Sequence, residues 1–373
     1  MSDNSGIVKS LEGLWGSNKA KGLLAQGVFF EELEKGTFGT DASDKILTGC
    51  WLLSPKQSDF YKFRYCFFIH PKLAKTETKE TEPKEVLGDK FRPFFAVAEF
   101  MNSASIGINY VMTSTDNGHI PLDDINTRRF QKLCWKFLCF QNGEFMQKDP
   151  FEFFQKWSGN RGRASYGKPW DSGIKERMQK LSRNTLEALI LNELFYTGFV
   201  KETLKKPLND PYDVDSFLMS ISQKHILPME IKEKFPRDAK DGKFFGIDAG
   251  RIMMLLRLCL PNEANAIYLI RELDEGSNFV GWKYITLADI IMTSSWNLQA
   301  GGKGMGGQST QTVRLPYDYF KKFDANEMSE DRLKEIGSLP KDAKNIAKQF
   351  GNGLCSRFGK TSMKSDWFER KTA

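Results

Sequence analysis

The hydrophobic period of this chain changes about a third of the way along, and this change constrains the fold more than any other feature. Before residue 125 the apolar runs are short and bounded by turn residues, as at 59–69 and 94–101, which is typical of strands. Further strands are expected at residues 27–30 and 45–53. Beyond residue 125 the period approaches 3.6, and residues 174–205 predict a helix that ends before Pro207. The sequence therefore predicts an α+β fold with a strand-containing N-terminal lobe and a larger, mainly α-helical C-terminal lobe.

Three regions are expected along the chain. Residues 1–125 form the strand-rich N-terminal lobe, residues 126–340 a mainly helical lobe with a basic and aromatic segment, and residues 341–373 a basic C-terminal helix and tail. Additional helices are predicted at residues 249–260, 262–273 and 286–299. No repeat with a period of roughly 20 to 50 residues is visible, which argues against a solenoid.

The cysteines and the apolar runs indicate the compartment. Six cysteines are scattered without a CxxC pair, which argues against a disulfide framework or a structural zinc site. The N-terminal residues are polar, unlike a signal peptide, and no apolar run approaches the roughly 20 residues that span a bilayer. We therefore expect a cytoplasmic protein with free thiols and no membrane partner.

The familiar catalytic motifs are missing from this sequence. Its three histidines, His70, His119 and His225, are far apart, and neither HExxH nor GxSxG occurs. Residues 302–307 match GxGxxG, but polar flanks replace the buried strand and the helix that a dinucleotide site requires. This run is interpreted as a glycine-rich loop. We assign no catalytic residue, no metal ligand and no cofactor from the sequence.

The sequence also contains the residue types of one kind of metal-dependent nuclease site. This kind of site places an acid on one strand of a hairpin and an acid-x-lysine sequence on the next strand. Asp238 followed by Asp241 and Lys243 offers these residue types. Only three positions separate the two acids, which is too few for a hairpin between them. They are interpreted as turn residues around Gly242.

Positive charge is concentrated in one part of the chain. Residues 128–183 contain thirteen Lys or Arg and five Asp or Glu, a net charge of +8, whereas the whole chain carries +7. The rest of the protein is therefore almost neutral, and the segment has the charge distribution of a nucleic-acid-binding surface.

Aromatic residues are interleaved with these basic residues. Rings can stack on the unpaired bases of a single strand while Lys and Arg neutralise its phosphates, without demanding a particular sequence. Many of the rings are equally expected in the core, whereas the small, polar and basic residues 158–168 are expected to be exposed. The predicted nucleic-acid-binding residues are Arg128, Arg129, Lys132, Lys136, Arg161, Arg163, Tyr166, Lys168, Arg177 and Lys180.

The C-terminus has a second, smaller basic region. Residues 341–373 carry eight Lys or Arg and three Asp or Glu, a net charge of +5. The tail also holds three large apolar side chains, Met363, Trp367 and Phe368, which favour docking on the same or a neighbouring subunit. We expect the tail to support a homo-oligomer.

In general character the chain resembles nucleocapsid or coat proteins of RNA viruses. The resemblance implies sequence-tolerant binding and encapsidation of single-stranded RNA, and a location in the host cytoplasm and the virion. Two alternatives stay open. One is a metal-dependent nucleic-acid-processing enzyme whose carboxylates hold Mg²⁺. The other is a protein-binding module for an acidic partner.

Overall fold

The computed structural model describes residues 4–55, 63–75, 85, 87–116, 118, 120, 132–157, 169–206, 208, 211–293, 299–303 and 309–357. The chain divides into two compact units, and each draws on separated stretches of sequence. The first unit comprises residues 1–31, 49–98 and 106–213, and the second comprises residues 32–48, 99–105 and 214–373. Where an element crosses a boundary, α2, β1 and α4 are grouped with the first unit and β6 with the second.

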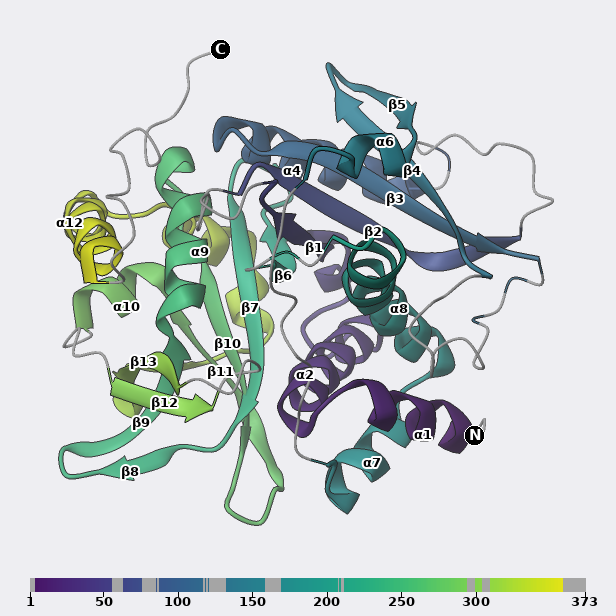
Figure 1. The fold of residues 1–373 in the computed structure, drawn as a ribbon. Coiled ribbons are helices and arrows are strands. Elements are labelled where there is room, and N and C mark those ends of the chain that lie inside the picture. The colour runs from purple at the N-terminus through teal and green to yellow at the C-terminus, as the bar shows by residue number, and fades with distance from the viewer. Residues whose placement is uncertain are drawn as a thin grey trace. The chain divides into compact units, whose positions relative to one another are not determined.

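The first unit combines five strands with several helices (Figure 1). Its strands lie in the order β1-β2-β3-β4-β5. They are β1 (Ile46–Leu53), β2 (Tyr65–Lys75), β3 (Gly107–Thr115), β4 (Cys134–Gln141) and β5 (Glu144–Lys148). The helices are α1 (Ser5–Leu14), α2 (Ser17–Glu34), the 3-10 turn η2 (Gly88–Lys90), α4 (Phe91–Ser103), α6 (Pro150–Phe154), α7 (Ser172–Gln179), α8 (Arg183–Leu194) and the π-helix η3 (Phe195–Thr203).

Aromatic rings dominate the core of the first unit. Phe67 of β2 stacks on Phe154 of α6 with ring centroids 5.7 Å apart, and Phe137 of β4 lies 5.9 Å from the same ring. All three side chains are fully or almost fully buried. Each such ring removes a large apolar surface from water, so this cluster contributes strongly to the stability of the unit.

The second unit contains five strands of a mixed sheet and a separate four-stranded sheet. The first set has the order β14-β11-β10-β7-β6, and the second has the order β12-β13-β9-β8. All of these strands except β14 are labelled in Figure 1. The strands are β6 (Tyr212–Met219), β7 (Ile226–Lys234), β8 (Arg237–Ala239), β9 (Gly242–Asp248), β10 (Ile267–Leu273), β11 (Phe279–Thr286), β12 (Gln299–Lys303), β13 (Ser309–Pro316) and β14 (Lys321–Lys322).

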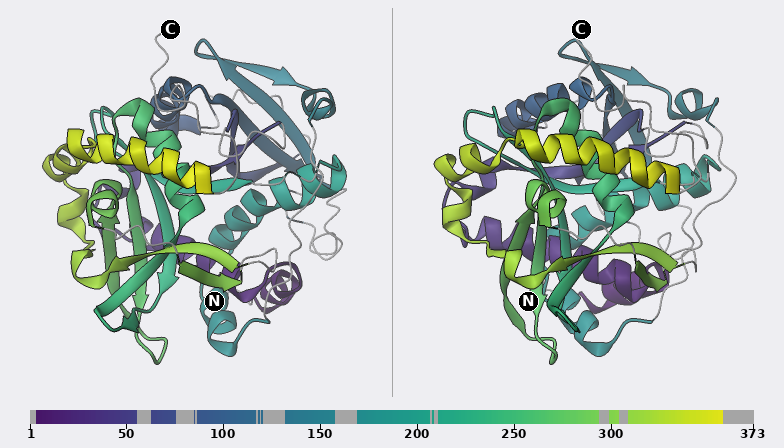
Figure 2. Two further views of the ribbon diagram at one scale, coloured as in Figure 1. Left: turned by 60° about the vertical axis from the view of Figure 1, so that its left-hand side comes forward. Right: turned by 90° about the vertical axis from the view of Figure 1, so that its left-hand side faces the viewer.

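Helices of the second unit connect and cover these strands. Helix α12 packs against α9 and α10, as the views in Figure 2 also show. The helices are η1 (Ala42–Lys45), α9 (Ala249–Cys259), η4 (Leu260–Asn262), α10 (Leu287–Thr293), η5 (Tyr317–Tyr319), η6 (Ala325–Met328), α11 (Glu330–Ile336) and α12 (Lys341–Arg357). No helix within the described ranges has the length and apolar character to cross a bilayer.

The predicted fold class is wrong, because the second half of the chain is rich in sheet and not a larger helical lobe. Residues 262–273 were expected to be helical, yet residues 267–273 form β10, which is buried at every position. A strand covered on both faces has no alternation of apolar and polar residues, so its apolar run cannot be distinguished from a buried helix by period. Residues 212–234, for which no element was predicted, form β6 and β7.

Other predicted elements divide between confirmed and wrong. The helix at 249–260 is confirmed as α9, and the strand at 45–53 is confirmed as β1. The strands predicted at 27–30 and 94–101 are wrong, because both segments lie in helices, α2 and α4. The glycine-rich run at 302–307 was interpreted as a loop. Its first two residues belong to β12, and residues 304–307 lie outside the described residues.

Both units contain the same sequence of strand pairings. In the first, β1 pairs antiparallel with β2, β2 leads through α4 to the parallel strand β3, and β3 pairs antiparallel with β4. In the second, β6 pairs antiparallel with β7, the chain passes through the β8–β9 hairpin and α9 to the parallel strand β10, and β10 pairs antiparallel with β11. We call this shared arrangement the ββαββ motif.

Candidate active site

The predicted nucleic-acid-binding residues divide into two groups. Arg128, Arg129, Arg161, Arg163, Tyr166 and Lys168 lie outside the described residues, as do Met363, Trp367 and Phe368 of the tail. The other four belong to the first unit. Lys132 and Lys180 are exposed, while Lys136 on β4 and Arg177 on α7 are half-buried. The Arg177 Nε donates to the Gly173 carbonyl at 3.0 Å within its own helix. The common positive surface therefore stays a prediction.

The aromatic rings of the same segment are mostly part of the core. Phe137, Phe154, Trp157 and Trp170 are buried, and the Trp170 indole donates to the Trp15 carbonyl at 2.7 Å. Phe151 is the exception, with 60% of its surface exposed. Rings that pack on one another inside the unit are not available for stacking on bases.

The acids considered in the sequence as a nuclease site lie on an exposed hairpin. Asp238 of β8 pairs in register with Lys243 of β9, and Asp241 lies in the turn between these strands. Gly242 completes the turn with a φ of +117°, a value that residues other than glycine rarely adopt. Because these carboxylates point from a tight solvent-exposed turn, they form no enclosed site.

A different acid and acid-x-lysine combination occurs where β6 and β7 separate. The antiparallel ladder of these strands runs from Met219 opposite Ile226 to Ser216 opposite Met229. At the next position of β6 the side chain of Asp215 replaces the backbone as hydrogen-bond acceptor. Its Oδ2 accepts a hydrogen bond from the Ile231 amide at 2.6 Å. A carboxylate in place of a backbone carbonyl thus ends the ladder. We call the point where β6 and β7 separate the fork, and the Asp215 carboxylate places a negative charge there.

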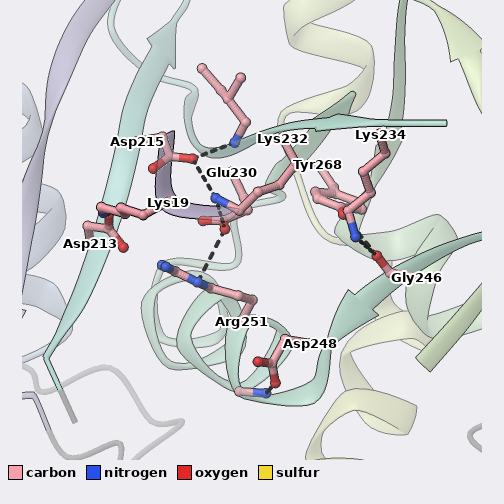
Figure 3. A network of polar contacts seen from close by, with 12 residues as sticks. Lys19, Asp213, Asp215, Glu230, Lys232, Lys234, Gly246, Asp248, Arg251 and Tyr268 are labelled. Atoms are coloured by element: carbon pink, nitrogen blue, oxygen red, sulfur yellow. Dashed lines mark hydrogen bonds and ion pairs between the residues drawn. The ribbon is translucent and has the colours of Figure 1, made fainter. Parts of the chain in front are cut away.

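Glu230 and Lys232 of β7 complete this cluster (Figure 3). The Lys232 ammonium lies 2.6 Å from Glu230 Oε1 and 3.3 Å from Asp215 Oδ2. Both carboxylate side chains are 0% exposed, whereas that of Lys232 is partly exposed. One cationic nitrogen therefore bridges two fully buried carboxylates, which come from the two strands of one hairpin.

Helix α9 supplies the second cation. Asp248 caps this helix by accepting a hydrogen bond from the Gly250 amide at 3.0 Å, and the following turn carries Arg251. The Arg251 Nε lies 3.2 Å from Glu230 Oε1. Despite these ion pairs, neither oxygen of Glu230 accepts an aligned hydrogen bond. Both ion pairs involve Oε1, whereas Oε2 is a buried oxygen that accepts no hydrogen bond from the described residues.

Burial and the charges of this cluster shift the pKa values of two neighbouring groups. Tyr268 of β10 lies beside Glu230 in the parallel register, and burial, reinforced by the Glu230 charge, raises the pKa of its hydroxyl well above the usual value. Burial, together with the nearby positive charge of Lys232, lowers the pKa of Lys234 to about 8. The Lys234 ammonium and the Tyr268 hydroxyl both donate to the Gly246 carbonyl, the latter at 3.0 Å. These contacts fix β9 beside the fork.

The donor set fits one type of cation. The described part of the chain contains no group of three or more His, Cys, Asp and Glu side chains placed to hold a metal. Two carboxylate side chains, Asp215 and Glu230, stand at the fork. Mg²⁺ is commonly bound by one or two carboxylates and completes its octahedral shell with water and substrate phosphate. The position of the Lys232 ammonium between the two oxygens shows where positive charge is favoured.

Two features of the sequence indicate this site, and neither depends on the spacing of apolar residues. Asp215 directly precedes Ser216 and the apolar end of β6, and Glu230 and Lys232 directly follow the apolar start of β7. Charged residues are rarely buried in a strand unless they are paired. No strand was predicted at 212–234, so the sequence alone does not bring these two segments together as a hairpin.

Comparisons with known proteins give no relative from which a role could be inferred. No protein-family model, no curated protein and no solved structure matches this chain.

Proposed function

We propose that the second unit is a Mg²⁺-dependent nuclease that hydrolyses phosphodiester bonds at the fork of β6 and β7. One observation carries this proposal: two fully buried carboxylates, Asp215 and Glu230, flank the ammonium of Lys232 in an acid and acid-x-lysine arrangement across a hairpin. Asp238, Asp241 and Lys243 have the same residue types but lie on one exposed turn. The exposed hairpin and the buried fork are thus separate candidates that experiments can distinguish.

Each side chain has a role that follows from its contacts. Asp215 and Glu230 would hold the cation, which would supply charge stabilisation at the scissile phosphate and a lowered pKa of water. The Lys232 ammonium, which lies against both carboxylates, would orient the attacking water or stabilise the developing negative charge. Arg251, which is paired with Glu230, would bind a phosphate oxygen.

The charge around the fork favours a polyanionic substrate. From β7 to the end of α9, residues 226–259 carry seven Lys or Arg and five Asp or Glu, a net charge of +2. The basic segment at 128–183 adds a larger excess of positive charge to the chain. Phosphate neutralisation by such residues supplies most of the sequence-independent affinity for nucleic acids.

The predictions of RNA encapsidation, of a homo-oligomer and of a cytoplasmic location stay predictions. The residues that would support the first two lie mainly outside the described residues. A nuclease and a nucleic-acid-binding protein share the same polyanionic partner. We favour the nuclease because the fork contains two fully buried carboxylates beside one ammonium, a charge arrangement that simple binding of RNA does not require.

The test is a cleavage assay on the full chain. End-labelled single-stranded and double-stranded DNA and RNA are incubated with Mg²⁺, with Ca²⁺ or with EDTA. Wild-type protein should cleave at least one of these substrates with Mg²⁺ and none with EDTA. The Asp215→Asn variant should lose this activity, because it replaces one of the two carboxylates by a neutral amide of the same shape.

The Asp238→Asn variant is the matched control, since it makes the same chemical change at the exposed hairpin. It should cleave at the wild-type rate. Cleavage that survives Asp215→Asn, or that disappears only in Asp238→Asn, would place the active site elsewhere. Absence of any cation-dependent cleavage by the wild type, with Asp215→Asn lowering only the melting temperature, would identify the cluster as a structural ion network.

A further inference from the structure

The shared ββαββ motif makes it possible to compare the active-site positions between the two units. In the second unit, Tyr268 lies beside Glu230 in the parallel pair of β10 and β7. In the first, Tyr110 lies beside Phe68 in the parallel pair of β3 and β2. Aligning the two motifs on these tyrosines places Phe68 at the position of Glu230.

The remaining positions follow from the antiparallel registers. Extending the ladder of β6 and β7 by one pair places Asp215 opposite Glu230, and in the first unit Cys50 is opposite Phe68. Two residues beyond Glu230 stands Lys232, and two residues beyond Phe68 stands His70. The helix between the parallel strands covers the same face in both units. Arg251 of α9 reaches Glu230, and Phe94 of α4 lies 5.2 Å from the ring of Phe68.

The first unit uses these positions for packing. Phe94 also contacts Tyr110 with ring centroids 5.5 Å apart, and the Tyr110 hydroxyl lies 2.6 Å from His70 Nδ1. Strands β1, β2 and β3 contain no Asp or Glu at all, whereas β6, β7 and β10 together contain five. Burial raises the pKa of the Cys50 thiol well above its usual value, so this residue stays protonated.

These positions in the first unit cannot hold a hard divalent cation. Mg²⁺ requires oxygen ligands, and a protonated thiol, a phenylalanine and an imidazole supply none. The aromatic ring of Phe68 moreover fills the space that a carboxylate occupies in the second unit. The two units thus share a scaffold, and only one retains the acid, acid-x-lysine set.

We infer that the two ββαββ motifs provide one hydrolytic centre between them, and that the protein therefore cuts one strand of a duplex in each binding event. The inference rests on the proposed nuclease function. It adds that the first unit contributes no second cut, so a double-strand break requires two independent events. The expected product from duplex DNA is a nick with water incorporated across a single phosphodiester bond.

A supercoiled plasmid distinguishes these outcomes. With full-length protein in excess and Mg²⁺ added, the supercoiled form should convert to nicked circles, and linear DNA should form at least an order of magnitude more slowly. Linear DNA that forms as fast as nicked circles would overturn the inference while leaving the nuclease function intact. No conversion at all, in plasmid and oligonucleotide assays alike, would overturn the nuclease function itself.

Variants of the first unit complete the test. His70→Gln and Cys50→Ala change its equivalent positions and should leave both rates unchanged, whereas Glu230→Gln should abolish nicking. A loss of linear product in His70→Gln or Cys50→Ala would reveal a second centre in the first unit and refute the inference. Light scattering tests whether two copies act together. If the rate of linearisation rises with the square of the protein concentration and light scattering detects a dimer, one cut per binding event is refuted.

Discussion

The ββαββ motifs of the two units bury opposite chemistry at equivalent positions. In the first unit Phe68, Phe94 and Tyr110 form a cluster of rings on the face covered by α4. In the second unit Glu230 and Arg251 meet on the face covered by α9. Rings gain free energy from burial, whereas charges lose hydration that their mutual attraction only partly restores. The comparison shows that the pairing order of the strands does not depend on what fills the space beneath the helix.

The hairpins of the two units differ as a consequence. The ladder of β1 and β2 continues through the pair of Cys50 and Phe68, but that of β6 and β7 stops one position before Asp215. The Asp215 carboxylate accepts the Ile231 amide that would otherwise serve the ladder. A charged hydrogen bond of this kind is stronger than a neutral one, so the fork is a stable structure and not a frayed end.

The largest expected effect is the loss of cleavage in Glu230→Gln. Removing one of only two carboxylates should withdraw several kcal/mol of stabilisation from the bound cation and the transition state, or about a thousandfold in rate. Phe68→Leu changes the equivalent position of the first unit and should keep the rate within about threefold of the wild type, since less than 1 kcal/mol of transition-state stabilisation is then involved. Single-turnover rates with Mg²⁺ measure both. Similar losses in the two variants would mean that both motifs take part in catalysis.

A smaller loss is expected from Lys232→Met, which keeps the length of the side chain without its charge. Positioned groups that handle protons typically contribute about a hundredfold or more, so the cleavage rate should fall by that factor while the cation still binds. The variant at the equivalent position, His70→Gln, should be unaffected. Rates from rapid quench and cation affinity from calorimetry separate the two effects. Loss of cation binding in Lys232→Met would show that the ammonium positions the carboxylates.

Addition of a cation should stabilise the second unit and not the first. A cation at a hundredfold excess over its dissociation constant adds about 2.7 kcal/mol to the native state. Amide exchange at Ile231 should slow on adding Mg²⁺ or Ca²⁺, while exchange in β1 and β2 should not change. Hydrogen exchange followed by mass spectrometry with fragment resolution measures this difference, with Asp215→Asn as the control. Protection that is equal in the two motifs would locate the cation elsewhere.

The smallest of these effects concerns the pH dependence of the first unit. Burial, reinforced by the charge of Lys72, lowers the pKa of His70 to about 4 from the usual 6.5. The folded state therefore favours the neutral ring, and its contribution to stability is complete above pH 6.5 and lost as the pH falls toward 4. The loss amounts to about 3 kcal/mol.

Urea unfolding at a series of pH values, followed by a probe in the first unit, tests this expectation. His70→Gln should flatten the decline between pH 6.5 and 4. Tyr110→Phe removes the hydroxyl beside the ring but keeps it buried, so the decline should persist in that variant. A decline that is the same in His70→Gln would assign the acid sensitivity to other groups.

The sequence alone determined several features of this protein. It showed the concentration of positive charge at 128–183, the absence of the familiar catalytic motifs and the helix that became α9. These features depend on composition and on local period, which neighbouring residues determine among themselves.

Only the tertiary structure decided where the acids meet. Asp215 and Glu230 lie on different strands, and their encounter depends on the register of β6 and β7 and on the point at which that ladder ends. The equivalence of Phe68 and Glu230 likewise follows from pairing and not from any similarity of sequence. Apolar runs such as β10 fit a buried strand or a helix equally well, and only the neighbours that enclose them select one. The physical reason is that strand pairing joins residues distant along the chain, so its energetics are absent from any local window of sequence.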